Sequence, residues 1–138
     1  VEDNPDDVEL TQMAFDQNNF ANEIVVVKDG QEAIDFLLGD HPNGVKERGY
    51  PIIILLDLKL PKLDGHEVLE ELKSHEQTRR IPVVILTSSK EEEDIVRGYD
   101  LGANSYVRKP VSYNNFVDVV NKLGVYWLAV NEKFKTDE

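Results

Sequence analysis

Five side chains that could act together in chemistry lie near the ends of segments that we expect to be strands: Glu2, Asp3, Asp57, Thr87 and Lys109. Asp57 comes directly after the five aliphatic residues 52–56, and Thr87 ends a second aliphatic run that begins at residue 83. An unbroken aliphatic run suits a parallel strand that is covered on both faces, and open parallel sheets bind ligands outside the carboxyl ends of their strands. We therefore expect these side chains to meet at one edge of a sheet.

Three carboxylates, a hydroxyl and an amine can together supply what phosphoryl transfer needs. The reaction needs an in-line nucleophile, a divalent cation that neutralises charge, and positioned hydrogen-bond donors. Clustered carboxylates repel one another when empty, and a divalent ion relieves that repulsion while it keeps Asp57 ionised as the nucleophile. Mg²⁺ prefers oxygen ligands, so the acids of this set favour Mg²⁺ as the ion.

The pattern of Asp57 with Thr87 and Lys109, behind the acidic pair Glu2/Asp3, resembles the receiver domain of bacterial two-component response regulators. The spacing is also similar, because Leu60-Pro61 and Asp64-Gly65 follow Asp57, Ser88 follows Thr87, and Pro110 follows Lys109. The resemblance covers nearly the whole chain. Within the family, residues 1–7, the loop 46–51 and a long final helix look most like the stand-alone regulators of cyanobacterial phytochromes.

The resemblance implies a role for each residue of the site. Asp57 would accept a phosphoryl group from a sensor histidine kinase, for which the subfamily suggests a phytochrome. Mg²⁺, or Mn²⁺ in its place, would be held by Asp3, Asp57 and the backbone carbonyl of Lys59, with help from Glu2 through water.

Further residues would contact the phosphoryl group or respond to it. By the same resemblance, Lys109 would pair with a phosphoryl oxygen, and the Thr87 hydroxyl and backbone N–H groups near Lys59 and Ser88 would complete the donors. Pro110 resembles the family's cis proline. Tyr106 aligns with the aromatic switch residue, and a buried strand tyrosine is the alternative interpretation.

Composition limits the class of protein and its partners. A chain of 138 residues fits one domain, here a receiver domain over 1–138, and leaves no room for an output domain. The 27 acidic and 15 basic residues give a formal charge of −12, which repels nucleic acids and anionic membranes. Cysteine is absent, and no apolar segment approaches the ~20 residues of a membrane span. We expect a cytoplasmic protein.

Alternating strand and helix patterns predict a doubly wound parallel α/β sheet. The receiver resemblance implies five strands in a flavodoxin-like (βα)5 fold with the order 2-1-3-4-5. Only residues 1–3 are available for the first strand, so we expect an aliphatic segment upstream of Val1. The loop 39–51 is long enough to be a partner surface or a tolerated insertion, and we favour an insertion. The three histidines are expected at the surface.

The final helix, predicted at about 114–133 before a polar tail 134–138, is more apolar than packing on one sheet requires. Packing alone explains its apolar residues 116–123 well but the later ones poorly. We therefore predict a homodimer, whose surface comprises Tyr106, Val119, Tyr126, Trp127, Val130 and Phe134.

Two other functions are less consistent with the sequence. A phosphatase that forms an aspartyl-phosphate on a similar sheet would place a second acid two residues after the nucleophile, where this chain has Lys59. A receiver-like protein that binds partners without phosphorylation would lack Asp57, Thr87 or Lys109, and all three are present. The expected role is a switch that promotes its own phosphorylation and dephosphorylation, rather than an enzyme.

Overall fold

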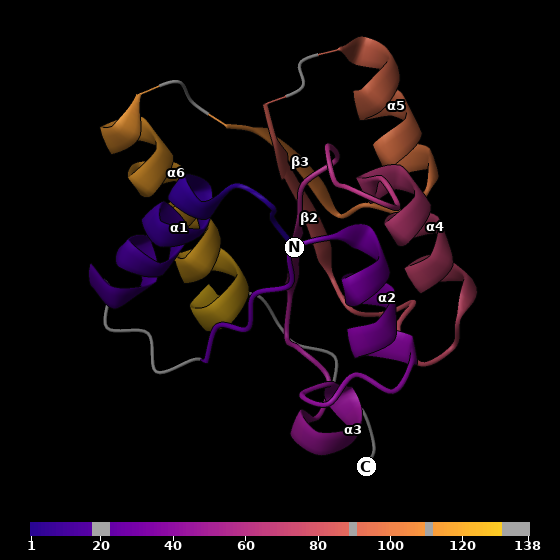
Figure 1. The fold of residues 1–138 in the computed structure, drawn as a ribbon. Helices are drawn as coiled ribbons and strands as arrows, with labels where there is room; N and C mark the ends of the chain where they lie inside the picture. The colour runs from indigo at the N-terminus through magenta and orange to yellow at the C-terminus, as the bar shows by residue number, and fades with distance from the viewer. Residues whose placement is uncertain (18–22, 89–90, 110–111, 131–138) are drawn as a thin grey trace.

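The computed structural model of the chain describes residues 1–17, 23–88, 91–109 and 112–130 (Figure 1). Helices and strands alternate along most of the chain. In chain order the elements are α1 (Pro5–Gln17), α2 (Gly30–Leu38), α3 (Val45–Arg48), β1 (Ile54–Leu56), α4 (Gly65–Ser74), β2 (Val83–Thr87), α5 (Glu92–Asp100), β3 (Ser105–Arg108), α6 (Tyr113–Gly124) and the π-helix η1 (Val125–Val130).

The three strands form a parallel sheet in the order β1-β2-β3. All five side chains of β2 are buried, which explains why its sequence is aliphatic up to Thr87. Two further segments continue the sheet beyond β1 through hydrogen bonds. The backbone of Val1 bonds to Leu55 and Asp57, and the N–H of Glu2 donates to the carbonyl of Val27.

These bonds place the chain start between β1 and the segment that ends at Val27. The order of the five segments is therefore the expected 2-1-3-4-5, and the doubly wound α/β fold is confirmed. Among the described residues, only the last three segments have a regular strand ladder. The expected first strand is thus limited to the first residues of the chain.

Helices cover both faces of the sheet (Figure 1). α1 packs along α6 on one face, while α2 and α4 lie together on the other and α5 lies beside α4 and β3. Each face has its own core. Leu86 of β2 packs with Phe116 and Val120 of α6, whereas its neighbour Ile85 packs in the cluster that includes α2 and α4. This alternation is what a strand buried on both faces requires.

The end of the chain departs from a single continuous α-helix. α6 begins at Tyr113, close to the expected start, but the backbone changes to a π-helix from Val125 to Val130. Phe116 and Val120 are buried, as the apolar spacing predicted, whereas Tyr126 is exposed. The expected tail 134–138 and Phe134 lie outside the described residues, and so does Pro110.

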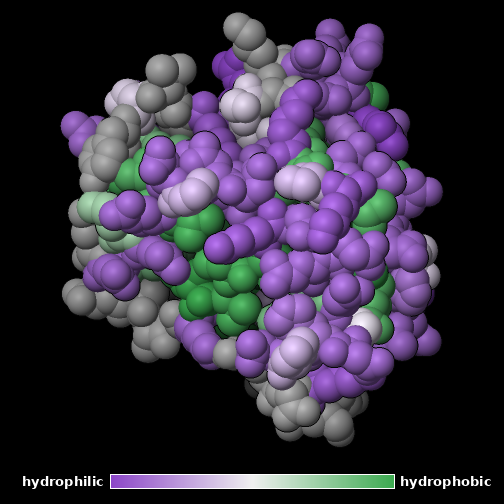
Figure 2. Space-filling model, in the orientation of Figure 1, coloured by the Kyte–Doolittle hydropathy of each residue, from purple (hydrophilic) through white to green (hydrophobic). Residues whose placement is uncertain are grey.

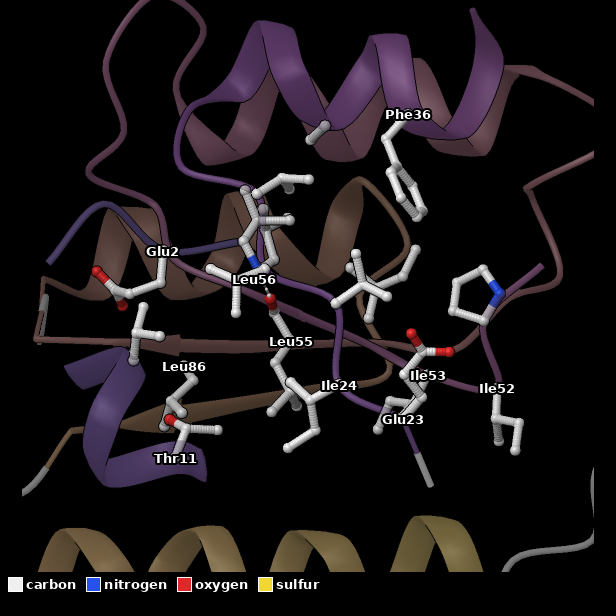
Figure 3. A pocket seen from close by; sticks show the side chains of 18 of the residues that line it. Glu2, Thr11, Glu23, Ile24, Phe36, Ile52, Ile53, Leu55, Leu56 and Leu86 are labelled. Carbon is white, nitrogen blue, oxygen red and sulfur yellow. Dashed lines mark hydrogen bonds between the residues drawn. The ribbon is translucent and has the colours of Figure 1, made fainter. Parts of the chain in front are cut away.

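A pocket of about 380 Å³ lies between the segment 23–27, β1 and α1. Its lining is mostly apolar, with Phe36 of α2 on one side and Thr11 of α1 on another (Figure 3). Figure 2 shows hydrophobic side chains reaching the surface on this face of the molecule.

The loop after α2 contains a short helix, α3, whose Val45 is buried against the core. The loop is therefore partly packed. Within the described ranges, no helix is long and apolar enough to cross a membrane.

Candidate functional site: an acidic cluster at the carboxyl end of the sheet

Asp57 follows directly on β1, and only 7% of its surface is exposed. Its carboxylate accepts hydrogen bonds from the Thr87 hydroxyl, from the backbone N–H of Lys59 at 3.3 Å and from the Lys109 ammonium at 3.0 Å. Thr87 is the last residue of β2 and is fully buried. The parallel register places β1 beside β2, so the two strand ends deliver these side chains to the same edge, as the sequence predicted.

Lys109 lies just beyond β3 and contacts three carboxylates. Its Nζ atom is 2.5 Å from Glu2 Oε2, 2.8 Å from Asp7 Oδ2 and 3.0 Å from Asp57 Oδ2. The backbone N–H of Lys109 donates to the carbonyl of Thr87 at 2.7 Å, which holds the lysine next to the end of β2. The lysine therefore uses its three ammonium donors on three acids.

Burial and neighbouring charges shift the pKa values of this cluster in opposite directions. Burial lowers the pKa of Lys109, but hydrogen bonds to Asp7 and Glu2 and the charge of Asp57 outweigh it and raise the pKa above its ordinary value. Burial raises the pKa of Asp57, yet the hydrogen bond from Thr87 and the Lys109 ammonium hold it below the usual range. Asp57 is thus ionised at neutral pH, as a nucleophile or metal ligand must be.

Glu2 behaves differently from Asp57. Burial is the main cause that raises the pKa of Glu2, and the nearby charge of Asp57 adds to it, although the hydrogen bond from Lys109 opposes the change. Excess negative charge therefore remains at the edge where Glu2 and Asp57 meet, and a cation there would relieve it.

Carboxylate oxygens of Glu2, Asp3 and Asp57 lie within 4.8 Å of one another, so one ion could contact all three groups. Oxygen donors of this kind suit Mg²⁺ or Mn²⁺ better than softer metals. The residues present therefore fit a divalent cation. The backbone of Lys59 lies beside the same carboxylate, since its N–H donates to Asp57.

The loop after Asp57 is fixed by the start of α4. Asp64 and Glu67 form a reciprocal capping box, in which each side chain accepts from the other's backbone N–H, at 2.9 and 3.5 Å. A Cβ atom on Gly65 would lie 2.3 Å from the carbonyl oxygen of Asp57, so only glycine allows this approach. The Asp64-Gly65 pair thus holds the backbone that carries Asp57.

The other predicted site residues lie less directly at the cluster. Ser88 follows β2 and is exposed. Tyr106 pairs with Ile85 in the sheet and is partly buried, with its ring beside Gly98 of α5. Its backbone N–H donates to the Tyr99 hydroxyl at 3.2 Å. This position is compatible with a switch residue and with an ordinary strand tyrosine.

Two features were missed or wrongly assigned from the sequence. Asp7 is not among the residues predicted for the site, although its carboxylate contacts the Lys109 ammonium. His66 is only 5% exposed, so its expected surface position was wrong. Its Nε2 atom lies 3.1 Å from the carbonyl oxygen of Asp94, which joins α4 to α5.

Comparisons with known proteins agree with this arrangement. The response regulator receiver domain family matches residues 1–121. The probable methanogenesis regulatory protein FilR2 of Methanothrix harundinacea is 41% identical over 131 residues, which are 95% of this chain and 83% of that protein.

Two solved structures share both fold and sequence with the chain. The phosphorylated cyanobacterial phytochrome response regulator RcpA has a TM-score of 0.91 and 39% identity, over 96% of this chain and 94% of that one. The Mn²⁺-bound form of the response regulator Rcp1 has a TM-score of 0.88 and 35% identity, over 98% and 96% of the two chains. The chain belongs to the response regulator receiver domain family and is close to Rcp1 and RcpA, the stand-alone cyanobacterial phytochrome response regulators.

Proposed function

We propose that the chain accepts a phosphoryl group from a sensor histidine kinase onto Asp57, in a reaction that requires Mg²⁺, and that it signals through protein contacts. The observation that carries this proposal is the buried, ionised Asp57 that contacts both Thr87 and Lys109 beside the oxygens of Glu2 and Asp3. Receiver domains are signalling switches rather than enzymes, and this arrangement suits such a role.

Each residue of the site has a definable part in the reaction. A carboxylate oxygen of Asp57 forms a bond to phosphorus as the phosphorus–nitrogen bond of the phosphohistidine breaks, and the imidazole keeps that electron pair. Lys109 and the Thr87 hydroxyl then donate to the phosphoryl oxygens, where the negative charge gathers. A divalent ion held by Glu2, Asp3, Asp57 and the Lys59 carbonyl would neutralise part of that charge.

The same residues support slow self-dephosphorylation, because the groups that stabilise charge during phosphorylation also stabilise it when water attacks the acyl phosphate. The contacts to the phosphoryl group would be completed by Ser88, its backbone N–H and Pro110. Tyr106 would transmit the change that phosphorylation causes at the site. A phytochrome is the first kinase to test, since RcpA, whose structure has a TM-score of 0.91 to this chain, is a cyanobacterial phytochrome response regulator. We expect this relay in the cytoplasm.

Phosphotransfer from purified, radiolabelled sensor kinases tests the proposal. A panel should include a phytochrome kinase and unrelated kinases, with the wild type, Asp57→Asn and Asp100→Asn as acceptors. Asp100 is an exposed acid at the end of α5, so its replacement controls for lost charge. We expect label to move to the wild type and to Asp100→Asn only with Mg²⁺. Label on Asp57→Asn would refute the proposal.

We also propose a homodimer through the surface that comprises Tyr106, Val119, Tyr126, Trp127, Val130 and Phe134. Tyr126 is 50% exposed and its ring meets that of Trp127 edge to face at 5.2 Å, so two large aromatic side chains form one surface. Exposed aromatic groups of this kind are enriched in protein interfaces. The chain's acidic charge argues against a nucleic acid as the partner.

Light scattering over a concentration series tests the dimer, with and without a phosphoryl mimic such as beryllofluoride. Tyr126→Lys should dissociate it, whereas Val25→Lys, at an exposed apolar residue on the opposite edge of the sheet, should not. A wild type that stays monomeric at high concentration in both states would refute the dimer. An unchanged dimer under the mimic would refute only its coupling to phosphorylation.

A further inference from the structure

Of the three acids that contact Lys109 in the described part of the chain, Asp7 is the one that lies on a helix. Its Oδ2 atom is 2.8 Å from the Lys109 ammonium, closer than Asp57 at 3.0 Å. The Asp7 side chain keeps 23% of its surface exposed and that of Lys109 keeps 9%, so the contact is largely shielded from water. A charge-assisted hydrogen bond in such a place is stronger than an exposed ion pair.

The first turn of α1 fixes where Asp7 points. Asn4 Oδ1 accepts from the backbone N–H groups of Asp6 and Asp7 at 2.9 and 3.4 Å, which starts the helix at a defined residue. The Thr11 hydroxyl donates to the Asp7 carbonyl at 2.8 Å one turn later. α1 also packs along α6. Asp7 is therefore attached to a rigid element and not to a loop.

The three acids around Lys109 differ in their roles. Glu2 and Asp57 belong to the group whose oxygens converge for a cation, together with Asp3, whereas Asp7 is not part of that group among the described residues. A divalent ion at that group would attract Glu2 and Asp57 and would repel the Lys109 ammonium. Asp7 would then be the acid that still holds the lysine at the site.

We propose that Asp7 is a positioning residue that holds Lys109 within reach of the phosphoryl group while the metal occupies the other acids. This inference rests on the proposed function, because it assigns Asp7 a part in the phosphorylation of Asp57. An acid in the first turn of a helix also interacts favourably with the helix dipole, and that effect alone would be a purely structural role.

Asp6 separates the two roles. It carries the same charge in the same helical turn, but its side chain is exposed, and Lys109 has its three ammonium contacts with other acids. Asp6→Asn therefore removes the dipole interaction and one unit of net charge without removing a contact of Lys109. Asp7→Asn removes the same charge and weakens the hold on the ammonium.

The first test measures the rate at which acetyl phosphate and Mg²⁺ phosphorylate the wild type, Asp7→Asn and Asp6→Asn. We expect Asp7→Asn to be slower by about tenfold, the usual size of a lost charged hydrogen bond, and Asp6→Asn to stay within about twofold of the wild type. Calorimetry should show similar Mg²⁺ affinities for the two variants. Equal rates for the two variants would overturn the role of Asp7, whereas a wild type that takes no phosphoryl group would overturn the proposed function itself.

The second test repeats the Asp7→Asn substitution in a Lys109→Ala background. A merely structural role of Asp7 would give the same effect in both backgrounds. The rate effect of Asp7→Asn should vanish there, since the lysine it positions is gone. In metal-free protein, Asp7→Asn should lower the urea midpoint of the wild type, yet raise that of Lys109→Ala, because it then relieves repulsion among acids. Equal shifts of the same sign in both backgrounds would refute the inference.

Discussion

Replacing Lys109 with alanine should destabilise the metal-free protein far more than an ordinary surface lysine would. The substitution leaves Glu2, Asp7 and Asp57 close together without their shared cation, and their side chains are only 15, 23 and 8% exposed. Removing one partner of a buried ion pair costs about 3–5 kcal/mol, and water contact at Glu2 and Asp7 reduces our expectation to about 2–4 kcal/mol.

The matched control is Lys122→Ala, which breaks only the exposed pair with Asp118 on α6, where the two side chains are 76 and 60% exposed. An exposed pair of this spacing contributes about 0.3–0.5 kcal/mol. Urea unfolding in the presence of a chelator measures both losses. The result that refutes our reasoning is a loss for Lys109→Ala no larger than that for Lys122→Ala.

Adding Mg²⁺ extends the same experiment. An ion that binds only the folded state stabilises it, and the empty acids of Lys109→Ala should attract the ion at least as well as the wild type does. Mg²⁺ should therefore recover more unfolding free energy in Lys109→Ala than in the wild type. Loss of Mg²⁺ binding in this variant would show that the lysine belongs to the metal site, contrary to our assignment.

Three more substitutions, one of them with a matched control, test other parts of the account. Asp3→Ala should weaken Mg²⁺ binding by about tenfold or more in a calorimetric titration, because it removes one of the three converging carboxylates; an unchanged affinity would exclude Asp3 as a ligand. Gly65→Ala should cost about 2 kcal/mol or more in urea unfolding, since its Cβ would meet the Asp57 carbonyl at 2.3 Å, whereas Gly49→Ala meets nothing within 4 Å and should cost about 1 kcal/mol for its positive φ; equal costs would contradict this. A backbone hydrogen bond lowers the pKa of Glu32 in the folded protein. Its carboxylate therefore adds stability that is fully present above about pH 4.3 and is lost as the pH falls through the lower folded-state pKa. Glu32→Gln should flatten this part of the acid unfolding curve. A curve of unchanged slope would count against it.

The meeting of Asp57 with Thr87 was predictable because each comes at the end of an aliphatic run, which is typical of a strand in a parallel sheet. Asp57 and Thr87 lie side by side for that reason, and Lys109 joins them at the end of the next strand. Helix starts were also predictable where the local chemistry is strong, as with Asp64 and Gly65 at α4. Such features depend on neighbours in the chain or on a simple alternation of elements.

Features that depend on distant contacts were not predictable in the same way. Asp7 and Lys109 are 102 residues apart, and no periodicity links a helix acid to a strand-end lysine. His66 is buried because α5 packs over it, which its polar neighbours Glu67 and Asp64 do not reveal. The π-helical end after α6 likewise has no signal in the apolar spacing, which both kinds of helix share over a short stretch.

The central claim, that Asp57 is the phosphoryl acceptor of this chain, is tested most directly by mass analysis after incubation with acetyl phosphate and Mg²⁺. We expect one phosphoryl group, located at Asp57, that is absent from Asp57→Asn and absent when the divalent ion is chelated. A phosphoryl group that persists in Asp57→Asn, or that is acquired without a divalent ion, would contradict the account.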